Sequence, residues 1–228
     1  MTSKHRYAEI DVLRAIAIVL MVLFHLVYDL REFGGININY QDPVWFLIGK
    51  ASALLFMFIS GLASGFSRAP VKRGIKVLFY GMGITVVTYL AMKDMYVRFG
   101  ILHFLGVTMI LSPLFYALSS RMLWALVGVS AVLGFWFKGL LLETSLFLPF
   151  GLMYKEFGSI DYYPLFPYIS ATFLGVLAYR YLYAQRTTPL LAFRQTYRPI
   201  QWLSQNSLMI YLVHQPLLLL IIFGIRLS

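Results

Sequence analysis

Seven apolar stretches recur along the chain, and each is long enough, or nearly long enough, to cross a lipid bilayer as a helix. Hydrophobic residues make up 60% of the 228 residues and charged residues only 12%. A transmembrane β-barrel would instead show short strands of alternating polarity. The sequence therefore predicts an all-α, polytopic membrane helical bundle forming a single domain over residues 1–228. The stretches fall at about 11–31, 45–66, 73–92, 99–118, 122–137, 164–183 and 203–225.

The region after the fifth stretch, which is itself short, is apolar but interrupted. It begins at Gly139 and reads GLLLETSLFLPFGLMYKEFGSIDYY, with Pro149, Gly151 and Gly158 inside it. Proline and glycine interrupt regular helix. The sequence leaves three structures open for residues 139–158: a re-entrant hairpin, an interfacial hairpin, or half of an extra span.

Lysine and arginine are distributed unevenly between the two sets of connections. One set holds Lys4, Arg6, Arg68, Lys72, Arg73, Lys76, Arg121, Arg180, Arg186, Arg194 and Arg198, whereas the other holds Arg31, Lys93, Arg98, Lys138, Lys155 and Arg226. By the positive-inside rule, we expect a multi-pass cell-membrane protein with a cytoplasmic N-terminus and an outer C-terminus. Asp11 and Arg14 interrupt the first apolar core, so we expect a retained helix and not a signal peptide.

The first stretch carries an arginine and a histidine eleven residues apart, Arg14 and His25. An eleven-residue spacing is close to three helical turns, so both side chains leave one face, roughly 16 Å apart along the axis. Titratable groups are costly in a bilayer, and this pair is therefore a candidate functional site. The alternative is that Arg14 pairs with Asp11 and reaches the membrane surface.

Further polar side chains are expected at a similar depth toward the outer surface. Asp29 lies four residues after His25, so the two share a helical face and can hydrogen-bond. A carboxylate beside a histidine favours general-base chemistry, because it fixes the tautomer and raises the basicity of the ring. The other candidates toward this side, or along the last stretch, are Tyr28, Lys50, His103, Ser207, Tyr211, His214 and Gln215.

Each of these groups also has a structural interpretation. The pair His25 and Asp29 would serve as helix–helix contact, and His103 as a satisfied packing histidine. The polar residues of the last stretch would form interhelical hydrogen bonds.

Several function classes are excluded by residues that the sequence lacks. It has no cysteine, which removes thiolate catalysis and Cys-ligated metals. It also has no P-loop, HExxH or GxSxG motif, and its histidines lack local metal-ligand spacing. A metal could then be held only by residues assembled across several helices, and we expect none. The net charge of +10 is explained first by membrane topology, with an anionic-ligand pocket as the second reading, and not by nucleic acid.

The opening segment DVLRAIAIVLMVLFHLVYDL resembles integral-membrane acyltransferases, and its Arg–ten residues–His pattern is the hallmark of the acyltransferase-3 family. Segments 49–65, 99–111, 162–180 and 204–216 resemble a related group, the bacterial and archaeal proteins similar to the heparan-α-glucosaminide N-acetyltransferase catalytic domain. The likeness extends over most of the chain.

This resemblance implies acyl transfer from cytoplasmic acyl-CoA, usually acetyl-CoA, to a sugar or glycan on the far side of the membrane. His25 matches the essential histidine of the acyltransferase-3 pattern, and Arg14 matches its arginine. A cytoplasmic vestibule with Arg14, and with Lys72, Arg73 or Arg180, would hold the phosphates. Lys50 is grouped with these cations as a cofactor-binding candidate.

In this interpretation His25 is the general base, oriented by Asp29, while Tyr28, His103 or His214 stabilises the oxyanion or protonates the thiolate. Tyr28, Ser207, Tyr211 and Gln215 are the substrate-binding candidates. A covalent acyl-histidine route stays open, as do O- versus N-transfer, the acyl chain and a homodimer. The competing interpretations are a transporter or flippase that uses the same polar stripe, and a purely structural membrane partner.

Overall fold

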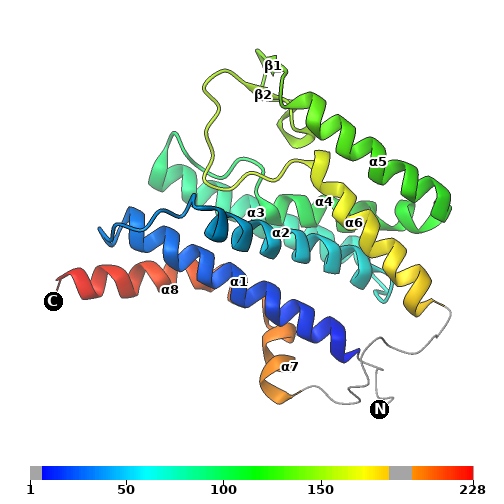
Figure 1. Ribbon diagram of the computed structural model, residues 1–228, viewed down its shortest axis with the longest axis horizontal. Helices are drawn as coiled ribbons and strands as arrows, with labels where there is room; N and C mark the ends of the chain where they lie inside the picture. The colour runs from blue at the N-terminus through cyan, green and yellow to red at the C-terminus, as the bar shows by residue number, and fades with distance from the viewer. Residues whose placement is uncertain (1–6, 185–196, 228) are drawn as a thin grey trace. The chain divides into compact units, whose positions relative to one another are not determined.

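The computed structural model describes residues 7–184 and 197–227, and within these ranges the chain is mostly helical, which confirms the predicted all-α class. Four basic residues counted toward topology, Lys4, Arg6, Arg186 and Arg194, lie outside the described residues. The elements in chain order (Figure 1) are α1 (Ala8–Glu32), α2 (Pro43–Ser64), α3 (Pro70–Met92), α4 (Ile101–Ala117), α5 (Ser120–Phe137), β1 (Leu141–Leu142), η1 (Leu148–Phe150), β2 (Met153–Tyr154), α6 (Leu165–Ala178), η2 (Tyr179–Tyr183), α7 (Arg198–Gln205) and α8 (Ser207–Leu227).

Helices occupy all seven predicted stretches. In the described part of the chain, α1, α2, α3, α5 and α8 are long and apolar enough to cross a membrane. α4 is apolar but has 17 residues, and the 14 residues of α6 continue as the π-helical turn η2. The predicted membrane bundle is therefore confirmed at the level of its helices.

The last predicted stretch, 203–225, is two helices and not one. α7 begins with Arg198 and Pro199, as is favourable for proline in a first turn. It ends at Gln205, where the side-chain amide of Asn206 donates to the carbonyl of Trp202 (2.8 Å). α8 then starts at Ser207. Asn206 and Ser207 thus form a junction between helices, and not the inner part of a continuous span.

The interrupted region after α5 folds without a helix of spanning length. β1 pairs in parallel with β2, and the single turn η1 lies between them. Every residue from Gly139 to Pro164 is described, so the extra half-span that the sequence left open is not present.

The chain divides into two compact units. The first consists of the described residues of Met1–Phe56 and Thr188–Ser228, and the second consists of those of Met57–Thr187. The first contains α1, α7, α8 and the beginning of α2, where the hydroxyl of Ser52 donates to the carbonyl of Ala17 on α1 (2.9 Å). The second contains the end of α2, α3 packed on α4, and α5 packed on α6.

Small residues allow close helix packing in the second unit. A Cβ atom at Gly61 of α2 would collide with the carbonyl oxygen of Thr172 on α6, and one at Gly175 of α6 would collide with that of Phe58. Tyr116 of α4 adds a hydrogen bond from its hydroxyl to the carbonyl of Gly61 (2.7 Å). Glycines at helix contacts are typical of membrane bundles, where van der Waals packing replaces the hydrophobic effect.

Candidate active site

α1 and α8 lie side by side and run in the same direction, although they come from opposite ends of the chain (Figure 1). Their contacts follow one order along both sequences, which fixes the parallel arrangement. α7 adds the first contact just before α8 begins. The successive pairs are Arg14–Ser204, His25–His214, Asp29–Gln215 and Phe33–Arg226.

Two histidines meet in the middle of this helix pair. The rings of His25 and His214 are 4.7 Å apart between centroids and nearly perpendicular, at 85°. Each Nδ1 lies against a carbonyl oxygen of its own helix: that of Met21 at 2.9 Å for His25, and that of Tyr211 at 2.7 Å for His214. A carbonyl only accepts, so each Nδ1 carries the hydrogen and each Nε2 has the lone pair in the neutral ring.

Asp29 lies one turn beyond His25 and has no exposed surface. One carboxyl oxygen, Oδ1, accepts a hydrogen bond from Nε2 of Gln215 on α8 (2.7 Å). The predicted hydrogen bond between His25 and Asp29 is not formed, because the partner of His25 is the Met21 carbonyl and that of Asp29 is Gln215. The two residues share a face as predicted. However, the tautomer of His25 is set by the Met21 carbonyl, and Asp29 is oriented by Gln215.

Three buried polar atoms in this cluster have no hydrogen-bond partner: Oδ2 of Asp29, Oε1 of Gln215 and Nε2 of His214. Two are oxygens that accept, and the third is the lone-pair nitrogen of an imidazole. Buried polar groups are usually paired, and each exception requires an explanation. The arrangement is suited to a ligand that brings hydroxyl or amine hydrogens to these atoms, and the ring of His25 lies beside that of His214.

A second polar group lies near the start of α1. Nη1 of Arg14 donates to the hydroxyl of Ser204 (2.9 Å), and that hydroxyl donates to Oδ1 of Asp11 (2.6 Å). Both Asp11 and Ser204 are buried. Sequence reasoning missed Ser204, because its position appeared to lie within a continuous last helix. The available signal was Pro199 followed seven residues later by Asn206, which marks a short separate helix.

Of the other predicted residues of the first unit, three lie beside aromatic rings and one begins a helix. Tyr28 contacts Tyr40 edge to face, with centroids 5.0 Å apart, and Nζ of Lys50 lies 5.7 Å from the ring centroid of Phe46. Ser207 is the first residue of α8. The ring of Tyr211 lies beside that of His214 (5.6 Å), so it forms part of the wall of the histidine pair.

His103 lies in the second unit, on the first turn of α4, and is almost fully buried. Its Nε2 is 3.2 Å from the hydroxyl of Thr85, which itself donates to the carbonyl of Val97 (2.7 Å). Nε2 of His103 therefore donates to Thr85. A Cβ at Gly81 would lie 3.3 Å from Nδ1 of His103, so the ring packs closely on α3.

The remaining predicted cations also belong to the second unit. Arg180 donates from Nη1 to the hydroxyl of Ser120 (3.1 Å) and from Nη2 to the carbonyls of Tyr116 (3.0 Å) and Leu118 (2.8 Å). These carbonyls end α4, where a cation is favourable. Lys72 and Arg73, in contrast, are exposed in the first turn of α3.

Among residues 7–184 and 197–227, no group of three or more His, Asp or Glu side chains is placed to hold a metal ion. The polar clusters described above consist of hydrogen-bonding and proton-transfer groups. Such groups can bind a polar ligand and can exchange protons with it.

Residues 6–216 of the chain match the family model described as "Heparan-alpha-glucosaminide N-acetyltransferase, catalytic". The chain belongs to this family. The match covers α1 to α6 and continues to Pro216, so both sides of the cluster at His25 and His214 lie inside the region that defines the heparan-alpha-glucosaminide N-acetyltransferase catalytic family. The resemblance inferred from the sequence is thereby confirmed. No curated protein and no solved structure matches the chain.

Proposed function

We propose that this membrane protein moves an acyl group, most simply acetyl, from cytoplasmic acyl-CoA to a hydroxyl or amine of a sugar or glycan on the outer side of the membrane. The observation that carries the proposal is the cluster of His25, Asp29, His214 and Gln215 between two apolar helices, with three buried atoms unpaired. Membership in the acetyltransferase family supports the reaction class.

The proposed step begins when Nε2 of His25 takes the proton of the acceptor hydroxyl or amine. The acceptor atom attacks the thioester carbonyl, so a C–O or C–N bond forms and the C–S bond breaks. The histidine pair returns the proton to the sulfur, which leaves as the free thiol of CoA. Because Nδ1 of His25 is held by the Met21 carbonyl, Nε2 keeps the lone pair that this step requires.

Asp29 and Gln215 bind the acceptor in this proposal. Oδ2 of Asp29 and Oε1 of Gln215 accept hydrogen bonds from its hydroxyl or amine groups, which satisfies two of the unpaired atoms. Asp29 also stabilises positive charge on the imidazole from one turn away along α1. A covalent variant, in which Nε2 of His25 itself takes the acetyl group, uses the same residues.

Arg14 is proposed to hold an anionic part of the CoA donor at the other end of α1. It lies eleven residues from His25 on one continuous helix, which corresponds to roughly 16 Å. That separation suits a donor that is held at its nucleotide end and reacts at its thioester end. Arg180, in the second unit, is assigned a structural role at the end of α4.

The proposed site requires a defined orientation in the membrane. A cytoplasmic N-terminus places Arg14 near the cytoplasm, where acyl-CoA is found, and His25 toward the outer surface. The excess of lysine and arginine in the connections on the N-terminal side supports this topology. In this proposal the protein lies in the plasma membrane, and the C-terminal end of α8 is at its outer surface.

The test measures CoA release from radiolabelled acetyl-CoA by the purified protein in nanodiscs, with amino and neutral sugars as acceptors. His25→Ala should lower kcat by about 10²- to 10⁴-fold, as expected for loss of a general base. Asp29→Asn should raise the KM for the acceptor and leave acetyl-CoA binding unchanged. The matched control is Asp42→Asn, because Asp42 is exposed and bonds only locally to Asn39.

Full activity of a folded His25→Ala protein would show that the site assignment is wrong. Movement of a sugar across the membrane without any CoA release would instead favour the transporter. Sugar movement requires two compartments, which nanodiscs lack, so it is measured with the same protein reconstituted in sealed vesicles.

A further inference from the structure

The segment between α5 and α6 exposes large apolar side chains although it is not a membrane-spanning helix. We call residues 140–150 the excursion; it contains β1, η1 and the turn between them. Leu146 is 77% exposed, and the other exposed apolar residues of the excursion are Leu140, Leu141, Phe147 and Phe150. Water-facing loops seldom expose several large apolar side chains within so short a segment, which marks the excursion as a candidate surface for binding.

The excursion is a folded structure with its own hydrogen bonds. The parallel pairing of β1 with β2 holds one end, and the backbone N–H groups of Leu148, Phe150 and Gly151 donate to carbonyls three residues earlier. Leu148 is buried, and its carbonyl accepts a hydrogen bond from the hydroxyl of Tyr162 (2.7 Å). Burial raises the pKa of Tyr162 to about 12, so this hydroxyl stays protonated and continues to donate.

This internal order explains which side chains are exposed. Leu148 occupies the inward position of the turn, whereas its neighbours Leu146 and Phe147 are exposed.

The exposed surface continues that of α5. The outward side of α5 carries Val129, Val132, Phe135 and Trp136, and Phe135 is 83% exposed. α5 is long and apolar enough to span, so we expect this side to face lipid. After α5 ends at Phe137, two exposed residues, Lys138 and Gly139, lead to the exposed Leu140 and Leu141.

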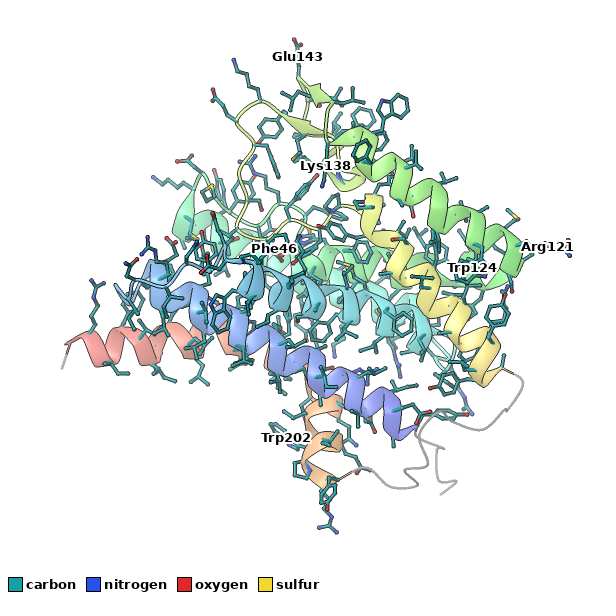
Figure 2. The ribbon with its side chains drawn as sticks, viewed as in Figure 1. Phe46, Arg121, Trp124, Lys138, Glu143 and Trp202 are labelled. Atoms are coloured by element: carbon teal, nitrogen blue, oxygen red, sulfur yellow. The ribbon has the colours of Figure 1, made fainter. Side chains whose placement is uncertain are left out.

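The charged residues of this region mark a boundary. Figure 2 shows Lys138 at the end of α5 and Glu143 at the tip of the excursion, whereas Arg121 lies at the opposite end of α5. A lysine at the end of a spanning helix reaches toward the membrane–water interface. The excursion therefore leaves α5 at the level of the interface and not in the hydrocarbon core.

We propose that the excursion binds the membrane surface beside the Lys138 end of α5, with Leu141, Leu146 and Phe147 inserted among the lipid headgroups and upper acyl chains. Its backbone is irregular at Glu143 to Ser145, and such backbone is tolerated at the interface but not in the hydrocarbon core. Exposed apolar side chains beside a short polar turn, here Glu143 to Ser145, are typical of interfacial anchors. This proposal is independent of the enzymatic function.

The absence of native cysteine allows a direct test. Single variants L146C and F147C carry a nitroxide label, and the full-length protein is reconstituted in phosphatidylcholine–phosphatidylglycerol vesicles. Electron paramagnetic resonance then compares collisions with oxygen, which concentrates in lipid, and with a water-soluble nickel chelate. F135C on α5 is the lipid-facing control, and K155C, at an exposed lysine beyond β2, is the water-facing control.

We expect labels at Leu146 and Phe147 to collide more with oxygen than with nickel, as at Phe135 but at a shallower depth. The label at Lys155 should show the reverse. Nickel-dominated collisions at both excursion sites would overturn the proposal by placing them in water. Low collision rates with both reagents would also overturn it, because the surface would then be covered by protein, such as a second copy of the chain.

Discussion

At the residue scale, the cluster between α1 and α8 contains polar side chains that are costly to bury, and three of their atoms have no hydrogen-bond partner. A buried polar group without a partner costs about 1–3 kcal/mol. Asp29, His214 and Gln215 each contain such an atom, in a region otherwise formed by apolar helices. Apolar side chains of similar size would avoid this cost. Retention of all three groups is consistent with a site whose pairing is completed by substrate.

His103 provides a test that separates packing from catalysis. In His103→Gln, the side-chain amide can still donate to Thr85, as Nε2 of the histidine does. We expect kcat for acetyl transfer to stay within about threefold of wild type, the range of ordinary context effects, while the melting temperature falls because the packing against Gly81 is imperfect. A hundredfold loss of kcat in a folded protein would instead show that His103 takes part in the reaction.

Sequence spacing predicted which residues share a helical face but not which residues bond. His25 and Asp29 share a face of α1, yet their partners are a backbone carbonyl and Gln215. An i,i+4 spacing describes one helix, whereas the hydrogen bond of Asp29 depends on how α8 docks. The sequence offered Asp11 as a partner for Arg14, and Ser204 of α7 hydrogen-bonds both residues, a contact that no local pattern predicts.

At the element scale, the parallel contact of α1 with α8 positions the whole candidate site. Both helices run in the same direction, so polar residues spaced along one meet those spaced along the other in order. α7 contributes by placing Ser204 at the beginning of this series. At the far end, Arg226 donates to the carbonyl of Phe33 (2.8 Å) and closes the end of α1.

Arg180 is expected to stabilise the contact among three elements of the second unit. Its hydrogen bonds join η2 to the end of α4 and to Ser120 of α5. Arg180→Met should lower the free energy of unfolding by roughly 1.5–3 kcal/mol, the contribution of hydrogen bonds to a charged group. The KM for acetyl-CoA should stay unchanged.

The matched control is Arg121→Met, because Arg121 is exposed at the start of α5 and should leave stability nearly unchanged. Thermal unfolding and steady-state kinetics of the two variants give both readouts. A large rise in the KM of Arg180→Met without loss of stability would restore the phosphate-binding role predicted from the sequence.

The seven helical stretches were predictable because apolar length is a strong signal in a membrane protein. The break at Asn206 was missed, although the spacing of Pro199 and Asn206 marks a short separate helix before α8. The excursion was recognised as irregular from Pro149 and Gly151. Its parallel β1–β2 pairing depends on residues ten or more positions apart, which helical periodicity does not describe.

At the scale of the whole molecule, the proposal requires that donor and acceptor react from opposite sides of the membrane. Arg14 and His25 lie on one spanning helix at different depths, so a donor held near one surface can react nearer the other. No part of the proposed mechanism requires CoA itself to cross. The orientation that places Arg14 toward the cytoplasm is part of the same claim.

The most direct test of this claim is vectorial acetyl transfer in sealed proteoliposomes of uniform orientation. Labelled acetyl-CoA is supplied only on the side of the N-terminus, and an impermeant sugar acceptor only on the other. We expect labelled acceptor in the opposite compartment with wild-type protein, CoA retained on the donor side, and no product with His25→Ala. Product formed only when donor and acceptor share one compartment, or equal product with His25→Ala, would contradict the claim.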